Sequence, residues 1–287
     1  MDVLKEVHRL EVVTRGAVDT LLRGAYQSNF RGQGLEFQQV REYHPEDDHR
    51  AIDWNVTARL NSPFVKTFTE ERELQLILAV DLSASLWVGT GPVSKRETAL
   101  RLSALLAFAA VQHQDRVGLL LFTDRVERYL PPRRGRTGAF RVLRELVGFK
   151  PQGRGTDFAP AFRLLNAALK RRSVVVLASD FTVALPPSEA GVLARRHDLV
   201  AAVLEDPLEK GFRLPARVAV RDPETGRVGV LRPGSVREAR EADRFRESQL
   251  KLLVRQGADQ LFLQAGQNVA PALMRFFRRR LERQGRR

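Results

Sequence analysis

Residues Leu74–Ser85 read LQLILAVDLSAS, and this stretch decides the fold. A mostly apolar run ends abruptly at Asp81, and Ser83 and Ser85 follow in an Asp-x-Ser-x-Ser spacing. A short apolar run of this kind is typical of a strand buried on both faces of a sheet. The stretch therefore predicts a buried β-strand whose carboxyl end carries one carboxylate and two hydroxyls.

Short apolar runs of the same kind recur along the chain and alternate with segments of helical periodicity. Further buried strands are predicted for DRVGLLLF (115–122), SVVVLASD (173–180), DLVAAVLED (198–206) and ADQLFLQAG (258–266), and an edge strand closed by its prolines for VERYLPP (126–132). Helices are predicted over 95–112, 140–147, 158–172, 188–197 and 269–281. This alternation predicts an α/β, Rossmann-like domain with a mostly parallel sheet covered by helices on both faces.

Two regions depart from this rhythm. Residues 1–72 combine a predicted amphipathic helix over 3–22 with short strands and loops, and we expect them to form an N-terminal appendage. Residues 73–287 form the main domain. Within it, 207–257 is predicted to be an insertion, with a hairpin around DPETG followed by a polar helix.

Oxygen-bearing side chains gather where the predicted strands end. Asp81 and Asp180 close two strands, Ser83 and Ser85 follow the first, and Thr156 lies in the Gly-rich loop QGRGTD. Ligands of such sheets bind outside the carboxyl ends of the strands. Carboxylates and hydroxyls suit a hard cation, so these five residues predict a site for Mg²⁺, with Mn²⁺ or Ca²⁺ as alternatives.

Each of these residues also has a purely structural interpretation. Asp81 and Ser83 could cap the segment that follows, and Thr156 or Asp157 could be the N-cap of the next helix. Ser179 and Asp180 could form an ordinary turn. Their joint occurrence on the correct strand ends favours a site.

The amino-acid composition narrows the possible functions less than these motifs do. The formal net charge of +14 raises the question of nucleic acid or an anionic membrane surface. Aromatic residues make up only 7%, too few to favour base stacking, so we expect no specific nucleic acid. No apolar run is long enough for a transmembrane segment, Met1–Leu10 lacks the apolar core of a signal peptide, and cysteine is absent. We expect a cytoplasmic protein.

We expect no enzyme. The chain has no phosphate-binding loop ending in Lys-Ser or Lys-Thr, no histidines at zinc spacing and no Gly-x-Ser-x-Gly elbow. Two alternatives stay open. One is a metal-dependent phosphoesterase or nuclease, although such sites usually assemble more carboxylates than two; the other is a basic nucleic-acid-binding protein.

The motifs DLSAS, GTD and SD resemble the metal-ion-dependent adhesion site of von Willebrand factor A domains. FRGQGLEFQQVREYHPEDDHRAIDW, RGTDFAPAF, VVVLASDF, DPLE and DPETG further resemble the domain-of-unknown-function 58 family. That resemblance implies a protein-protein interaction module working with a MoxR-type AAA+ ATPase in the assembly or maturation of complexes. The metal would then bind a Glu or Asp of the partner.

A polar-aromatic cluster near the N-terminus and the arginine-rich last helix complete the predictions. The cluster between Arg41 and Trp54 is either a second interaction surface, a catalytic carboxylate pair or a salt-bridged network, and we favour the network. The last helix is predicted to pack through apolar residues while its arginines stay solvated. The residues concerned are Arg41, Glu42, Tyr43, Asp47, Asp48, Arg50, Asp53 and Trp54 in the cluster, and Leu273, Phe276, Phe277 and Leu281 in the helix.

Overall fold

A computed structural model describes the side chains and backbone of most of the chain. The described residues are 5, 8–11, 36–45, 47–49, 52–60, 62–69, 74–87, 91–210, 217–224, 226–231 and 236–284. The chain forms two compact units, one of Arg31–Glu73 and one of Met1–Phe30 together with Leu74–Arg287. The start of the chain thus groups with the larger unit. Of the helix predicted over 3–22, Lys5 and His8–Glu11 are helical, and the remainder lies outside the described residues.

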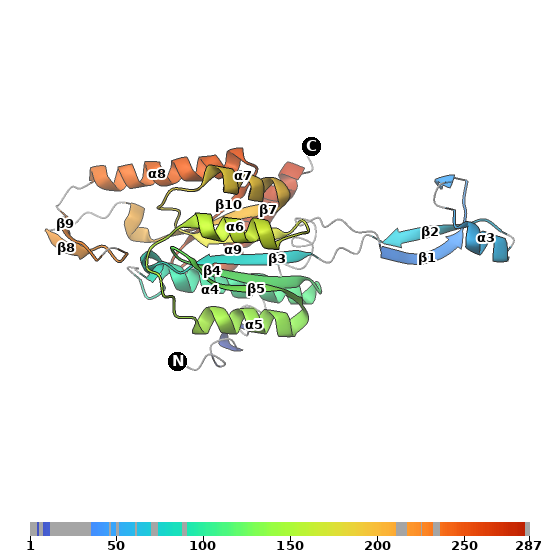
Figure 1. Cartoon of the computed structure of the whole chain (residues 1–287), viewed down its shortest axis with the longest axis horizontal. Helices are drawn as coiled ribbons and strands as arrows, with labels where there is room; N and C mark the ends of the chain where they lie inside the picture. The colour runs from blue at the N-terminus through green and yellow to red at the C-terminus, as the bar shows by residue number, and fades with distance from the viewer. Residues whose placement is uncertain are drawn as a thin grey trace. The chain divides into compact units, whose positions relative to one another are not determined.

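The larger unit is built on a six-stranded sheet (Figure 1). Its strand order is β10-β7-β6-β3-β4-β5, and all neighbours are parallel except β4 and β5. This is the doubly wound order in which the chain starts in the middle of the sheet and reverses direction beside the first strand. The Rossmann-like fold is therefore confirmed. The strands are β3 (Gln75–Asp81), β4 (Arg116–Phe122), β5 (Val126–Arg134), β6 (Val174–Ser179), β7 (Asp198–Glu205) and β10 (Asp259–Gln264).

Helices cover both faces of this sheet, and β3 shows why. Leu76, Leu78 and Val80 point into one apolar core, whereas Ile77 and Ala79 point into the other, as the two-residue period of a strand requires. Apolar side chains of three helices fill each core. The first core takes α4 (Lys95–Gln112), α5 (Gly135–Gly148) and α9 (Val269–Gln284); the second takes α6 (Phe158–Ala168), α7 (Pro187–Arg196) and α8 (Val236–Arg255).

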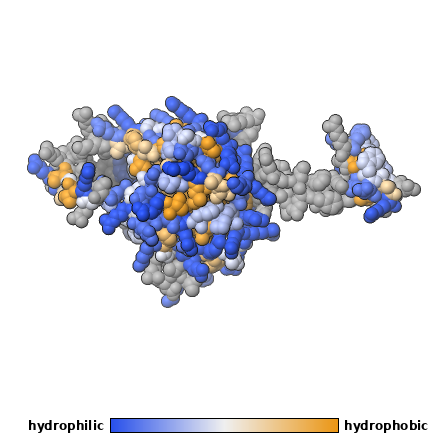
Figure 2. All heavy atoms as spheres, viewed as in Figure 1, coloured by the Kyte–Doolittle hydropathy of each residue, from blue (hydrophilic) through white to orange (hydrophobic). Residues whose placement is uncertain are grey.

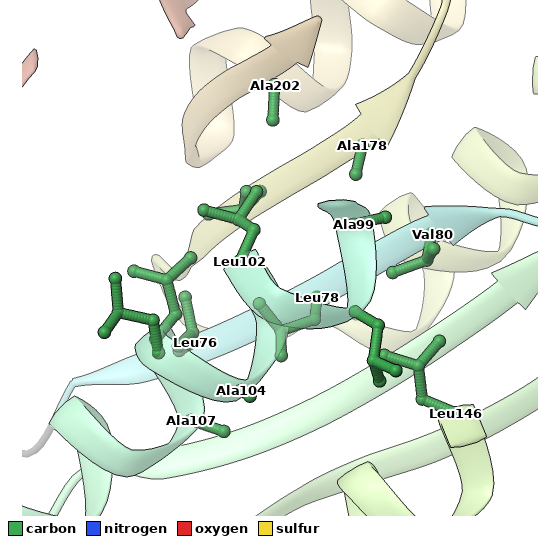
Figure 3. Close-up of a cluster of buried hydrophobic side chains, with 14 of the residues drawn as sticks. Leu76, Leu78, Val80, Ala99, Leu102, Ala104, Ala107, Leu146, Ala178 and Ala202 are labelled. Atoms are coloured by element: carbon green, nitrogen blue, oxygen red, sulfur yellow. The ribbon is translucent and has the colours of Figure 1, made fainter. Parts of the chain in front are cut away.

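Helix α4 is buried on nearly every side, as its sequence predicts. Figure 3 shows its Ala99, Leu102, Ala104 and Ala107 beside the β3 side chains of the first core. The alanines let the helix approach the sheet closely without leaving voids. The end of β3 and the start of α4 are thereby held in fixed positions, and the candidate site is built on both.

Two predicted boundaries at the antiparallel edge are wrong. Strand β5 does not close at its prolines but continues through Pro131 and Pro132 to Arg134. An edge strand pairs on one side only, so it tolerates residues without an N–H. Opposite them stands Gly118, where a Cβ would lie 2.9 Å from the Leu130 carbonyl oxygen. Helix α5 begins at Gly135, five residues earlier than the apolar pattern predicts.

The predicted insertion has the expected elements. A short 3-10 helix η3 (Pro207–Lys210) precedes a two-stranded hairpin of β8 (Val218–Arg221) and β9 (Val228–Leu231), and α8 follows. In α9, Leu273, Phe276 and Phe277 are buried as predicted. The prediction that all arginines of this helix stay solvated is wrong, because the largely buried Arg280 pairs with Asp198 and Asp259.

The smaller unit contains β1 (Glu36–Glu42) and β2 (Phe64–Thr69), an antiparallel pair, and α3 (Trp54–Leu60). Arg41 donates to both carboxylate oxygens of Asp47, at 2.6 and 2.8 Å. Asp53 accepts from the backbone N–H of Asn55 at 3.0 Å and so caps α3. These contacts give members of the Arg41–Trp54 cluster structural partners within the unit; Arg50 lies outside the described residues.

The visible surface of the larger unit is mostly hydrophilic (Figure 2). In the described ranges, none of the helices combines the length and apolarity that crossing a membrane requires. The cytoplasmic location stays a prediction.

Candidate metal centre at the carboxyl edge of the sheet

Strands β3 and β6 are neighbours in the sheet and end side by side. Asp81 is the last residue of β3, and its Oδ1 accepts a 2.8 Å hydrogen bond from the Ser83 backbone N–H. This bond turns the chain sharply, so that the hydroxyls of Ser83 and Ser85 come within 3.1 Å of each other. The Asp-x-Ser-x-Ser spacing thus collects its three polar side chains at one point.

The Gly-rich loop brings Thr156 to the same point. The Glu127 carboxylate accepts from the backbone N–H of Gly153 at 2.7 Å, and Ala84 N–H donates to the Arg154 carbonyl at 2.8 Å. Gly153 is required, because a Cβ there would lie 2.2 Å from the Thr123 hydroxyl. These contacts place the Thr156 hydroxyl 3.4 Å from Asp81 Oδ2.

Asp157, rather than Thr156, caps the helix that follows. Its carboxylate accepts from the Ala159 N–H at 2.8 Å, which is the N-cap contact of α6. The Thr156 hydroxyl instead faces the strand ends. The capping interpretation therefore accounts for Asp157 and leaves Thr156 with the predicted site.

Asp180 is fixed from three sides directly after β6. Lys95 Nζ donates to its Oδ2 at 2.8 Å and the Thr182 hydroxyl to its Oδ1 at 2.9 Å, and the Ser85 hydroxyl lies near enough to lower the pKa of Asp180. The next residue, Phe181, is fully buried and has a φ of +55°, a left-handed conformation that bulky residues rarely adopt. Stacking of its ring on Phe158, at 5.6 Å between centroids, helps to hold it there.

All five predicted residues therefore belong to one hydrogen-bonded group. Asp81 contacts Thr156 and the Ser83 backbone, Ser83 contacts Ser85, and Ser85 contacts Asp180. Within the described ranges, no three His, Cys, Asp or Glu side chains gather closely enough to hold an ion by themselves. Hydroxyl oxygens would have to complete any metal site here, as the prediction states.

The two carboxylates differ in electrostatic environment. Burial, reinforced by the nearby negative charge of Asp180, raises the pKa of Asp81 from 3.8 to about 7, although Ser83 and Ser179 donate to it. Burial also opposes ionisation of Asp180, but the Lys95 ammonium outweighs it and holds the pKa of Asp180 below its usual value. One carboxylate has a buried counter-ion. The hydrogen-bond partners of the other in the described part of the chain include no basic group.

Sequence reasoning missed three charged residues around this group. Lys95, the first residue of α4, is buried and bridges Asp180 to Glu209 Oε1, the latter at 2.7 Å. Glu224 reaches the Thr156 hydroxyl from the β8–β9 turn, at 3.4 Å. The two glutamates lie in the motifs DPLE and DPETG, which are among the segments that resemble the family. That resemblance was the one feature of the sequence that could have pointed to them. No pattern in the sequence singles out Lys95.

The donor set fits a hard divalent cation. Asp81, Asp180 and the hydroxyls of Ser83, Ser85 and Thr156 would hold the ion, and all are ligands that Mg²⁺, Mn²⁺ or Ca²⁺ accepts. The fully buried Asp81 carboxylate beside a second carboxylate is the observation that supports this fit. A bound cation would supply an electrophilic centre at the sheet edge.

Fold and site together define a Rossmann-like α/β domain with an oxygen-rich group at its strand ends. The chain belongs to the DUF58 family: the family model described as "Protein of unknown function DUF58" matches residues 39–249. The uncharacterized proteins Rv1480 of Mycobacterium tuberculosis and Mb1516 of Mycobacterium bovis are each 32% identical to it over 222 residues. Each match covers 76% of this chain and 69% of the relative.

Solved structures resemble the chain more distantly. The conserved hypothetical protein BatB from Bacteroides thetaiotaomicron aligns with a TM-score of 0.48 and 17% identity, over 73% of this chain and 99% of that one. A von Willebrand factor type A protein from Catenulispora acidiphila aligns with a TM-score of 0.39 and 10% identity, over 76% of this chain and 43% of that one.

Proposed function

We propose that this chain is a non-enzymatic, metal-dependent protein-protein interaction module. It holds Mg²⁺, with Mn²⁺ or Ca²⁺ as alternatives, at Asp81, Ser83, Ser85, Thr156 and Asp180. The observation that carries the proposal is the Asp81 carboxylate, which is fully buried beside Asp180 and surrounded by hydroxyls. A divalent cation would neutralise that buried charge.

The charge balance favours an acidic group on the partner. Mg²⁺ prefers six oxygens and gives up its water reluctantly, so positions stay open for water or an incoming ligand. Asp180 already shares its negative charge with Lys95 at 2.8 Å, and hydroxyls contribute none. The ion would therefore keep net positive charge and attract a Glu or Asp of the partner.

We propose a MoxR-type AAA+ ATPase as that partner, in assembly or maturation of protein complexes. The support is membership of the DUF58 family, whose members the sequence resemblance links to such ATPases. The exposed Arg154 beside Thr156 would steer an acidic surface towards the metal.

The donor set supports binding rather than catalysis. Metal-dependent phosphoesterases commonly clamp the reacting phosphate between two ions held by several carboxylates. Here Lys95 occupies one side of Asp180 with a fixed ammonium. We expect no turnover of a generic phosphoester such as p-nitrophenyl phosphate with Mg²⁺ or Mn²⁺. Turnover that disappears in Asp81→Ala would favour the phosphoesterase instead.

Calorimetry with Mg²⁺ and with Mn²⁺ tests the metal site. The intact protein should bind one ion, and Asp81→Ala and Asp180→Ala should both lose binding. Asp124→Ala is the matched control, because Asp124 lies at the same edge of the sheet but pairs with Arg125 outside the ligand group. Equal binding by the intact protein and Asp180→Ala would contradict the assignment.

Capture of a purified MoxR-type ATPase tests the interaction. Affinity should fall sharply in EDTA, return when excess Mg²⁺ is added, and be absent in Asp81→Ala. An affinity that EDTA leaves unchanged would make any bound metal structural and refute the mechanism of binding.

A further inference from the structure

The insertion returns to the candidate metal centre with a carboxylate of its own. Glu224, in the turn between β8 and β9, accepts from the Thr156 hydroxyl at 3.4 Å, and the Ser85 hydroxyl lies near enough to lower the pKa of Glu224. It thus lies beside two of the three predicted hydroxyl ligands. Its backbone lies outside the six-stranded sheet, so this carboxylate is supplied by the insertion and not by a strand end.

The turn is built to present this side chain. Asp222 N–H donates to the Arg227 carbonyl, and Gly226 N–H donates to the Asp222 carbonyl, both at 2.8 Å. Asp222 Oδ1 accepts from the Glu224 N–H at 2.9 Å. Gly226 has a φ of +72°, which closes the turn and which a side chain would disfavour. Glu224 therefore stands at a structured turn, and its direction towards the site is set by the local backbone.

A second contact joins the insertion to the same centre. Glu209 of η3 receives Lys95 Nζ at 2.7 Å and Arg246 Nη1 of α8 at 2.9 Å. Arg246 is itself buried and also pairs with Asp243 at 2.9 Å. Lys95 Nζ also donates to Asp180, so the ion pairs of Glu209 extend to the candidate metal centre. The segments before and after the hairpin are thus fixed firmly, whereas the hairpin reaches the site through Glu224.

The hairpin exposes apolar side chains and meets the candidate metal centre through a long contact. Val228 and Val230 of β9 are 65% and 59% exposed, and the hairpin carries apolar colour on its outer surface in Figure 2. The Thr156–Glu224 contact, at 3.4 Å, is long for a hydrogen bond to a carboxylate. We therefore expect the hairpin to leave the site more easily than η3 and α8, which the ion pairs of Glu209 with Lys95 and Arg246 hold together.

We propose that Glu224 is an internal ligand, the carboxylate that fills the open position of the metal centre until the acidic side chain of a partner displaces it. This inference rests on the proposed metal-dependent function. The two carboxylates are chemically alike, and Glu224 already lies beside the hydroxyls that would hold the ion. Because Glu224 is tethered, its effective concentration is high, so only a partner with additional contacts would displace it. The insertion would thereby select against free acidic metabolites and isolated acidic peptides.

Water-proton relaxation with Mn²⁺ tests whether Glu224 occupies a coordination position, because the relaxation rate depends on how many water molecules the bound ion carries. The proteins compared are the intact chain, Glu224→Gln and Glu247→Gln, with Asp81→Ala as the site knockout. Glu247→Gln is the matched control, since it makes the same change on an exposed residue of the insertion that pairs with Lys251. Glutamine keeps the size of Glu224 and removes its charge.

We expect Glu224→Gln to bind Mn²⁺ roughly ten-fold more weakly than the intact chain, because a charged ligand is lost. The bound ion should carry about one more water molecule. Millimolar acetate should lower the relaxation of the Mn²⁺ complex of Glu224→Gln and leave that of the intact chain nearly unchanged. Glu247→Gln should behave as the intact chain does.

The outcomes separate the two proposals. If the intact chain binds Mn²⁺ and Asp81→Ala does not, while Glu224→Gln matches the intact chain in affinity, hydration and response to acetate, the internal ligand is refuted and the metal site stands. If the intact chain and Asp81→Ala bind Mn²⁺ equally or not at all, the metal site is refuted, and the internal ligand with it.

Discussion

Polar side chains are buried at both ends of the strands in the six-stranded sheet. We call the amino ends of the parallel strands the amino edge and their carboxyl ends the carboxyl edge. The two differ in the partners that these side chains have. At the amino edge, Asp115 Oδ1 accepts from the Leu74 N–H at 2.9 Å, and the Ser173 hydroxyl donates to Gln75 Oε1 at 2.8 Å. Asp198 pairs with Arg280. Each of these contacts joins a donor to an acceptor or a cation to an anion. Each involves a residue at or directly before the first residue of a strand.

At the carboxyl edge the arrangement is less balanced. Asp81 and Asp180 lie close enough for the charge of one to raise the pKa of the other, and only Asp180 has a buried ammonium beside it. The Glu224 carboxylate adds a third negative group nearby, and its pKa is raised by burial and by Asp180, although the nearby Ser85 hydroxyl lowers it. The amino edge therefore gives its largely buried carboxylate Asp198 a counter-ion in Arg280, whereas the carboxyl edge gives Asp81 no basic partner among the described residues, at a place where a cation could bind.

The largest expected effect comes from removing that charge. The pKa of Asp81 is about 7 in the fold against an ordinary 3.8, so its ionisation destabilises the metal-free protein progressively as the pH rises from about 4, and the full penalty is present above pH 7. Asp81→Asn should raise the free energy of unfolding in EDTA at pH 8 by about 3 to 4 kcal/mol. Urea denaturation measures this, with Asp124→Asn as the exposed control.

The same variant should lose all stabilisation by Mg²⁺. A variant less stable than the intact protein in EDTA at pH 8 would show that Asp81 stabilises the fold as the amino-edge residues do. The contrast between the two edges would then be wrong.

The amino edge should respond to pH in the opposite direction. His197 is 2% exposed, and its Nδ1 accepts from the Ser173 N–H. Burial, aided by Arg196 and Arg172, lowers its pKa from 6.5 to about 4. Because the folded pKa is depressed, its stability contribution is complete above pH 6.5 and falls as the pH drops towards 4. The loss should reach about 2 kcal/mol at pH 5.

Protonation of Asp81 stabilises the metal-free protein over the same pH range, so the intact chain masks the loss at His197. In Asp81→Asn, acidification from pH 7.5 to pH 5 in EDTA should lower the free energy of unfolding. In His197→Asn, the same acidification should raise it. Equal pH profiles for the two variants would remove the difference between the edges.

Much of this arrangement could be predicted from the sequence, because strand ends and apolar periodicity are local properties. The runs ending in Asp81 and Asp180 predicted that these polar side chains lie together, and α4 has the predicted bounds of 95–112. Lys95 could not be predicted, since a lysine at the start of a helix is ordinarily solvated and only tertiary packing buries it. Likewise, the motif DPETG predicts a turn but not its destination at Thr156.

The smallest expected effect comes from the two serines that flank β6, where the same substitution probes both edges. The Ser173 hydroxyl at the amino end donates to Gln75 Oε1 and to the Arg171 carbonyl, at 2.8 and 2.9 Å. The Ser179 hydroxyl at the carboxyl end donates to Asp81 Oδ2 at 2.7 Å. Ser173→Ala removes a stabilising contact, so it should lower the free energy of unfolding by about 1 kcal/mol and leave Mg²⁺ affinity unchanged. Ser179→Ala removes the group that orients the proposed ligand Asp81, so it should weaken Mg²⁺ binding by roughly ten-fold, as the loss of such supporting contacts usually does. Calorimetry measures the Mg²⁺ affinity of both variants, and urea denaturation measures their free energy of unfolding. Equal Mg²⁺ affinities would mean that Ser179 has the same structural role as Ser173. Binding of the ion would then not depend on how Asp81 is oriented.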